Sequence, residues 1–253
     1  MTAGQISQQI FNLQYNFNCQ ENFLKYFLLF KAEKENMINK NIGLIEYSRR
    51  VDAGNCITHA VGAVLSVPAF FMLVTKAEGF RETVSAIIFG LSLMAVYTVS
   101  AVYHGLPQGG AKQTARLIDH STVPVLIAGT ATPCALITLY NISVAHSIMI
   151  FVLAWGCTLF GLFAKLFFFE KTRKITVAVY IVCCLVMISS GIPVLGKING
   201  DAFGGLVLGN VFYLIGALFC GIGRKKPVFH IVFHIFALIA SAIHFYVIYK
   251  FVI

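Results

Sequence analysis

The chain has 253 residues, of which 58% are apolar and only 11% carry charge, and its mean hydropathy is +0.81. These values exclude an ordinary soluble domain and predict an integral membrane protein. The net charge of +9 suits contact with anionic lipid. Because the sequence carries no nucleic-acid-binding motif, we expect no nucleic-acid partner.

Residues 1–45 differ in composition from the rest of the chain, since they are rich in Asn, Gln and Phe and carry the charge cluster 31–35. They lack the features of a secretory signal peptide. We expect a loosely ordered cytoplasmic tail. The alternatives are an amphipathic helix on the membrane around 23–30 and a translation start at Met37. The membrane domain is then 46–253.

Six charge-free stretches follow the tail, and a helix needs roughly 20 residues to cross the hydrocarbon. They are 56–75, 83–111, 120–164, 175–196, 202–223 and 227–249. The stretch 120–164 is long enough for two spans, with a hairpin at 140–143. Because lipid cannot satisfy an open backbone, each span should be helical. The sequence therefore predicts an all-α integral membrane fold, a bundle of seven transmembrane helices.

The distribution of Lys and Arg predicts the orientation of this bundle. Six precede the first span, two lie between spans 2 and 3, four between spans 4 and 5, and three between spans 6 and 7. One face thus collects fifteen of the nineteen basic residues. The positive-inside rule places that face, and the N-terminus, in the cytoplasm and the C-terminus outside.

Polar side chains recur at the predicted cytoplasmic ends of the second, third and seventh spans. They are Ser100, Tyr103 and His104, then Asp119, then His230 and His234. The i,i+4 spacing of Ser100 with His104, and of His230 with His234, puts each pair on one helical face. Ionisable residues inside a membrane are costly and are usually functional. These residues therefore predict a functional site near the cytoplasmic boundary.

Three imidazoles with one open position are typical of a catalytic zinc site. We expect His104, His230 and His234 to bind Zn²⁺, which lowers the pKa of bound water toward ~7. Asp119 then either orients a ligand or deprotonates that water, and Ser100 donates a hydrogen bond.

Structural alternatives exist for each of these residues. Asp119 can pair with Arg116, Ser100 can bond its own backbone, and an intramembrane His can bridge helices. Among the other histidines, His59 is expected to pack or to make an interhelical hydrogen bond, with a place in the site wall as the alternative. His120 is expected at a helix end beside Asp119, His146 in solvent, and His244 about 15 Å from His234, too far to share a metal.

The chain resembles the hemolysin III family, within the wider class of progestin and adipoQ receptors, from about residue 46 to its end. Five motifs carry the resemblance. They are Asn55-x₂-Thr58-His59-x₂-Gly62, Ser100-Ala101-x-Tyr103-His104, Leu117-x-Asp119-His120-Ser121, Ile127-Ala128-Gly129-Thr130-x-Thr132-Pro133, and His230-x₃-His234 with His244-Phe245. The chain departs from the family pattern at Pro124, Ala131 and Cys220. These departures affect packing or pocket shape rather than the ligand set.

The resemblance implies a seven-helix fold with a cytoplasmic N-terminus and a zinc ion near the inner leaflet. It also implies that His104, His230 and His234 are the ligands, with Ser100 and Asp119 next to them. Relatives of the family include alkaline ceramidases, adiponectin receptors are linked to ceramide hydrolysis, and members were named for haemolytic activity.

We therefore expect a multi-pass plasma-membrane protein that hydrolyses the amide or ester bond of a membrane lipid with zinc. One alternative is a haemolytic, pore-forming protein. The sequence disfavours this alternative, because it shows no charged stripe suited to line a pore. Another is a regulator that senses lipid, in which zinc is a structural clamp and no turnover occurs. The sequence does not indicate an oligomeric state.

Overall fold

The computed structural model describes residues 44, 47–191 and 196–253, and every regular element among them is helical. The elements are α2 Arg49–Lys76, α3 Phe80–Gly105, α4 Gly110–Pro133 with its π-helical extension η1 Cys134–Leu139, α5 Val144–Gly191, α6 Gly200–Gly223, and α7 Val228–Val247 with its π-helical extension η3 Ile248–Val252. The predicted tail, 1–45, lies outside the described residues except for Leu44, so the boundary at residue 46 stays a prediction.

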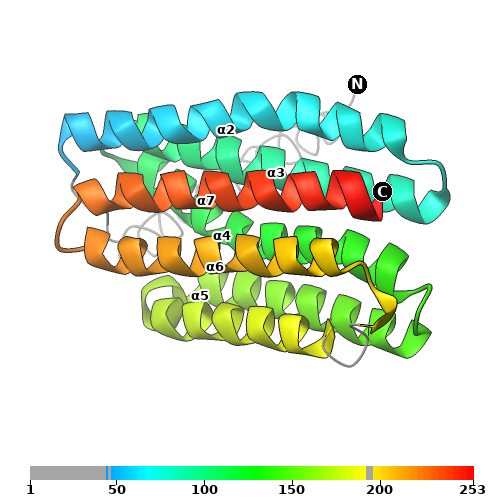
Figure 1. Cartoon of the computed structure of the whole chain (residues 1–253). Helices are drawn as coiled ribbons and strands as arrows, with labels where there is room; N and C mark the ends of the chain where they lie inside the picture. Colours follow the sequence, from blue (N-terminus) through cyan, green and yellow to red (C-terminus); the bar gives the residue numbers. More distant parts are fainter. Residues whose placement is uncertain (1–43, 45–46, 192–195) are drawn as a thin grey trace, which may run out of the picture. The chain divides into compact units, whose positions relative to one another are not determined.

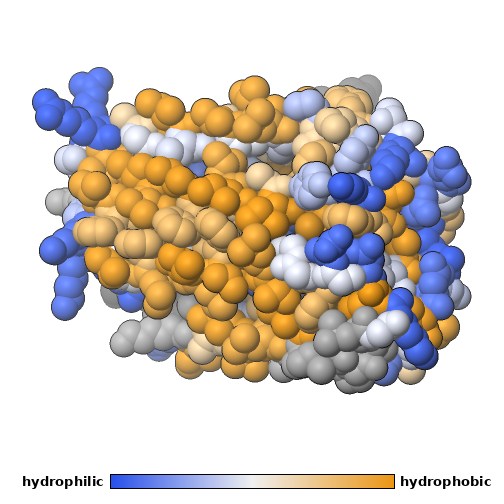
Figure 2. Space-filling view, viewed as in Figure 1, coloured by the Kyte–Doolittle hydropathy of each residue, from blue (hydrophilic) through white to orange (hydrophobic). Residues whose placement is uncertain are grey.

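Six helices of the described part are long and apolar enough to cross a membrane. They are Arg49–Lys76, Phe80–Gly105, Gly110–Leu139, Val144–Lys165, Gly200–Gly223 and Val228–Val252. Apolar side chains cover the helices along their length, and charged ones gather at the two ends of the visible face (Figure 2). Together these features define a multi-pass membrane protein. The fifth predicted span, 175–196, includes four residues outside the described ranges, so it stays a prediction together with the orientation.

The chain reverses direction inside α5. At Phe168 the backbone leaves the helical region, with φ −139° and ψ 40°. A Cβ atom at Gly161 would overlap the ring and hydroxyl of Tyr180, so the segments before and after Phe168 lie against each other. Figure 1 shows the two halves of α5 side by side. The turn predicted at 140–143 is confirmed, because no helix covers these four residues.

The packing of α2, α3 and α7 determines where the candidate site lies. α2 packs against both α3 and α7, and α7 also packs against α6. Small residues allow close approach: Gly62 faces the Tyr97 ring and Gly209 faces the His244 ring. As Figure 1 shows, α2 begins, α3 ends and α7 begins at one end of this bundle. The first turns of α2 and α7 and the last turn of α3 therefore meet.

The start of α2 is fixed by its capping residues. Ser48 is the N-cap, and its hydroxyl accepts a hydrogen bond from the Val51 amide at 3.4 Å. Asp52 lies in the first turn, where a carboxylate is favoured by the helix dipole. The cap therefore places Asp52 at the end of the bundle where α3 ends.

Candidate metal centre

Three histidines from two helices form a group that could hold a metal ion. His104 comes from the last turn of α3, and His230 and His234 from the first two turns of α7. One ring nitrogen of each lies within 4.8 Å of one nitrogen of each of the others. The ring centroids are 4.6 Å apart for His230 and His234, 5.1 Å for His104 and His234, and 5.4 Å for His104 and His230. The structure thus brings together the three residues that the sequence predicted as ligands.

Asp52 orients the His104 ring. The His104 Nδ1 atom lies 3.1 Å from Oδ1 of Asp52, and the second oxygen, Oδ2, accepts a hydrogen bond from Nζ of Lys112 at 2.9 Å. Lys112 also donates to the Leu106 carbonyl at 3.0 Å, which ties the start of α4 to the end of α3. The other ring nitrogen of His104, Nε2, is buried and has no hydrogen-bond partner within the described part of the chain. A carboxylate on one imidazole nitrogen and a free second nitrogen is the usual state of a metal ligand.

The His234 ring is oriented by the backbone of α2. Its Nδ1 atom lies 3.3 Å from the Asn55 carbonyl oxygen and 3.3 Å from Oγ1 of Thr58. Because a carbonyl oxygen only accepts hydrogen bonds, Nδ1 carries the proton and Nε2 keeps its lone pair. His234 is 1% exposed, so this lone pair lies inside the bundle.

The donor set fits a divalent transition-metal ion. Imidazole nitrogen suits zinc, copper, nickel and iron, and structural or catalytic zinc sites use three or four such donors at ~2.0–2.1 Å. Three tetrahedral ligands at that bond length stand about 3.4 Å apart. The three ring nitrogens lie within 4.8 Å of one another, so binding of an ion would draw them closer together.

Ser100 and Asp119, the two predicted catalytic residues, are neighbours beside His104. Ser100 lies one turn before His104 on α3, is 2% exposed, and its side chain hydrogen-bonds to the Asp119 side chain. Arg116 is the nearby charge that acts on Asp119. Asp119 therefore interacts with Arg116, as the ion-pair alternative expects, and also with Ser100, as the predicted site expects. The two interpretations are compatible.

Tyr47, which the sequence did not single out, closes the group from the side of the α2 N-terminus. Its ring stacks on His230 with centroids 5.4 Å apart and planes 21° from parallel, and its centroid lies 5.8 Å from that of His104. Burial raises the pKa of the Tyr47 phenol well above its ordinary value, so the hydroxyl is neutral and can donate a hydrogen bond.

Asp52 was also not among the predicted site residues, because it lies just before the first charge-free stretch. A signal was present, since Asp52, Asn55 and His59 recur at i,i+3 and i,i+7 and share one face of α2. That face turned out to be the wall of the three-histidine group.

The remaining histidines lie outside the group of three. His59 stacks on His234 with centroids 3.7 Å apart, a contact that fits both packing and a place in the site wall. His244 contacts the Leu206 carbonyl at 3.1 Å through Nε2, and His146 contacts Oγ of Ser143 at 3.0 Å through Nδ1. The expectation of a helix end at His120 was wrong, because α4 already begins at Gly110 and His120 lies inside it. Its ring is edge-on to the Phe169 ring, with centroids 5.3 Å apart.

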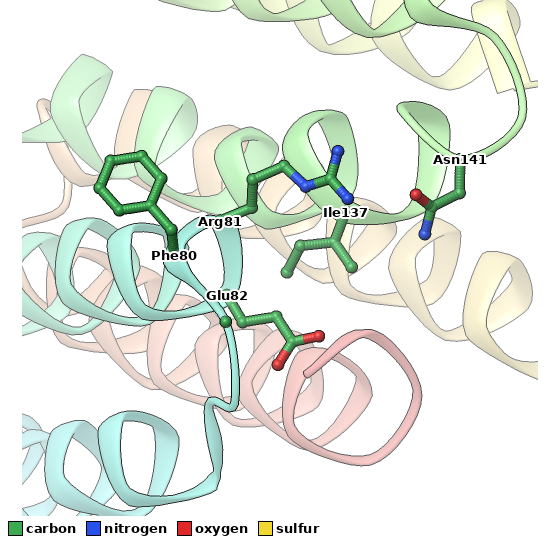
Figure 3. Close-up of a pocket in the computed structure, with 6 residues that line it drawn as sticks. Phe80, Arg81, Glu82, Ile137 and Asn141 are labelled. Carbon is green, nitrogen blue, oxygen red and sulfur yellow. The ribbon is translucent and has the colours of Figure 1, made fainter.

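A separate pocket lies where the α2–α3 connection meets η1. It has a volume of about 210 Å³ and is lined by Gly79, Phe80, Arg81, Glu82, Ile137 and Asn141 (Figure 3). The Arg81 guanidinium lies 4.0 Å from the centroid of the Tyr140 ring. None of the predicted site residues lines this pocket, so it does not belong to the histidine group.

The fold and site thus define a class: helical, multi-pass membrane proteins with three imidazoles gathered at one end of the bundle. The chain belongs to the Haemolysin-III related family, whose sequence pattern matches residues 47–245. This range contains every predicted site residue, and also Tyr47 and Asp52.

Three relatives illustrate the similarity. The chain is 32% identical to the Hemolysin-3 homolog of Bacillus subtilis (strain 168), over 79% of this chain and 93% of the relative. It is 31% identical to Hemolysin-3 of Bacillus cereus, over 77% and 89%. It is 25% identical to the Monocyte to macrophage differentiation factor of Homo sapiens, over 79% and 83%.

Proposed function

We propose that this protein is a zinc-dependent hydrolase of the plasma membrane that cleaves the amide or ester bond of a membrane lipid. In this proposal seven helices span the bilayer, the N-terminus is cytoplasmic, and His104, His230 and His234 hold Zn²⁺. The supporting observation is the state of His104, whose Nδ1 atom is bound by Asp52 while the buried Nε2 atom has no partner among the residues that the structure describes. When bound, zinc polarises a carbonyl group and lowers the pKa of water.

The side chains around the histidines supply the proton chemistry. In hydrolysis the oxygen of water bonds to the lipid carbonyl carbon, and the bond from that carbon to nitrogen or oxygen breaks. Asp119 accepts the proton that water loses and returns it to the leaving nitrogen or oxygen, so its carboxylate is regenerated. The hydrogen bond from Ser100 fixes the Asp119 carboxyl group toward α3. Asp52 keeps the His104 ring in position.

The position of the site suits a lipid substrate. The outward faces of the helices are apolar (Figure 2), so an acyl chain can stay in hydrocarbon while the polar head reaches the end of the bundle. Exposed basic residues surround that end: Arg49 and Arg50 at the start of α2, and Arg224, Lys225 and Lys226 before α7. Basic residues favour the cytoplasmic face, where they attract anionic lipid.

Metal analysis of purified protein tests the proposal. We expect about one zinc per wild-type chain, as three imidazole ligands allow, and little in the double variant His230→Ala/His234→Ala. His146→Ala is the matched control, because His146 contacts Ser143 and lies outside the group of three. Equal zinc in the wild type and the double variant would refute the site. Turnover of a panel of lipid amides and esters by zinc-loaded wild type, and loss of turnover in the double variant, tests the reaction.

The names of the two Bacillus relatives favour a second candidate, a membrane-perturbing protein. Dye release from liposomes that contain the purified protein distinguishes the two. Release that is equal with and without zinc, together with absent lipid turnover, supports the second candidate. Bound zinc with neither release nor turnover points instead to a lipid-sensing regulator in which zinc is a clamp.

A further inference from the structure

The three candidate ligands differ in what fixes their rings. The Asp52 carboxylate holds the His104 ring, and the Asn55 carbonyl holds the His234 ring. The His230 ring has no hydrogen-bond partner in the described part of the chain. It is also only partly buried, whereas the other two ligands are buried. Because a metal-binding imidazole usually has a partner that fixes its orientation, His230 requires a contact of another kind.

The Tyr47 ring lies against one face of the His230 ring. Their centroids are 5.4 Å apart and their planes are 21° from parallel. The other described rings beside His230 are inclined to it by 48° to 60° and belong to Phe233, His104 and His234. Stacked rings attract each other beyond the area that they bury. Tyr47 is therefore the described side chain best placed to restrict the rotation of the His230 ring.

The backbones on both sides of this contact are fixed by the fold. Tyr47 directly precedes Ser48, the N-cap of α2. At the end of α6, Gly223 contacts the backbone of His230, and a Cβ atom there would come within 3.0 Å of the His230 amide nitrogen. A side chain on a fixed backbone still chooses among several rotamers. Stacking on Tyr47 favours the rotamer in which a His230 nitrogen lies within 4.8 Å of a nitrogen of each of the other two ligands.

We propose that Tyr47 is a positioning residue of the candidate metal centre, and that its ring holds His230 in the metal-binding orientation. This inference rests on the proposed function and deepens it, because it adds a group that keeps the three ligands in place. The ring provides the stacking, and the hydroxyl takes no part in it. Phe should therefore replace Tyr47 without loss, while Leu and Ala, which lack a flat face, should not.

Metal binding by the purified full-length chain tests this role without reliance on turnover. Zinc affinity is measured by competition with a chromophoric chelator, and the visible absorption of Co²⁺ in place of zinc reports the arrangement of the ligands. The variants are Tyr47→Phe, Tyr47→Leu and Tyr47→Ala. Tyr246→Leu is the control, because Tyr246 is 53% exposed and contacts Lys250 and Phe251 at the far end of α7. The melting temperature of each metal-free variant shows whether it is folded, and two substitutions without a ring are used so that one can serve if the other does not fold.

We expect Tyr47→Leu and Tyr47→Ala to bind zinc roughly 2–10-fold more weakly than the wild type, as the loss of one stacked pair of rings implies, and to show altered Co²⁺ absorption. Tyr47→Phe and Tyr246→Leu should match the wild type in both measurements. Weak binding by Tyr47→Phe would overturn the inference, because the hydroxyl would then be the required group. Wild-type affinity and absorption in Tyr47→Leu and Tyr47→Ala, with or without a lower melting temperature, would also overturn it, since His230 would then be held without the ring.

The fate of the proposed function is read separately, from turnover of the lipid panel. If the wild type turns over lipid and Tyr47→Leu matches it in zinc affinity, the inference fails and the function stands. If the wild type binds zinc with an affinity that depends on the Tyr47 ring but turns over no lipid, the function fails and the inference stands. A wild type that binds neither zinc nor Co²⁺ overturns both.

Discussion

The Nδ1 atom of His104 lies 3.1 Å from the Oδ1 atom of Asp52, across the contact between α3 and α2. This contact determines which nitrogen of His104 is free, and it connects the first turn of α2 to the candidate metal centre. Because Lys112 binds the other oxygen of the same carboxylate, the start of α4 is coupled to it as well. Asp52 therefore links the starts of α2 and α4 to the proposed site.

Replacement of Asp52 by Asn should weaken zinc binding by roughly 10–100-fold, the usual effect of losing the carboxylate that orients a metal-bound His. Competition with a chromophoric chelator measures the affinity. Lys112 is 1% exposed and would lose its carboxylate partner, keeping the Leu106 carbonyl, so the double variant Asp52→Asn/Lys112→Met separates the metal effect from destabilisation. Asp201→Asn, at an exposed position in the first turn of α6, is the control. Wild-type affinity in the double variant would show that Asp52 serves only to neutralise Lys112.

Asp119→Asn should retain zinc and lose at least about 100-fold in lipid turnover, because general acid–base catalysis contributes a factor of roughly 10²–10⁴. Ser100→Ala should reduce turnover less, since it removes a group that orients Asp119 and leaves the carboxylate in place. Zinc content and initial rates on one lipid amide check both variants. Full activity of Asp119→Asn would remove Asp119 from the proposed mechanism.

Gly209→Ala should destabilise the bundle by about 1–3 kcal/mol, the usual cost of forcing extra volume into a packed interior. A Cβ atom at this position would overlap the His244 ring of α7. Gly204→Ala on the same helix is the control, because a Cβ there meets nothing within 4 Å. Thermal unfolding in detergent, followed by circular dichroism, gives the comparison. Equal melting temperatures would mean that α6 and α7 can move apart without loss of stability.

The predicted orientation can be tested by cysteine labelling in intact cells with a membrane-impermeant maleimide. Lys225→Cys, in the connection before α7, should stay unlabelled until the cells are opened. Asn141→Cys, in the turn after η1, should react from outside. Both positions are exposed, and the unsubstituted chain gives the background from its own cysteines. Labelling of Lys225→Cys in intact cells would show that the topology is the reverse of the predicted one.

Periodicity and charge were sufficient to predict most of the spans and the grouping of the three histidines. The charge-free stretches match the described helices, because a membrane helix must be apolar over a defined length. The i,i+4 spacing of His230 and His234 needs only the geometry of one helix. The proximity of these two residues to His104 could be predicted because short connections between the spans bring the chain back to the same end of the bundle.

Features that depend on contacts between distant helices were not predictable. The pairing of Asp52 with His104 requires α2 to pack against the last turn of α3, and no local pattern reports that contact. Tyr47 precedes the first span, and its ring contacts His230 only because α7 begins beside it. The reversal at Phe168 falls within the charged connection 165–174 that the sequence predicts between spans 4 and 5, but its position within that connection was not predictable, because an aromatic residue gives no turn signal of the kind that Gly or Pro gives.

X-ray absorption at the zinc edge of purified wild-type protein, compared with His104→Ala, tests the central claim most directly. We expect about three imidazole nitrogens and one further light atom at roughly 2.0–2.1 Å in the wild type, and one imidazole fewer or no zinc in His104→Ala. A wild-type protein without zinc, or an identical zinc environment in His104→Ala, would contradict a metal centre built from α3 and α7.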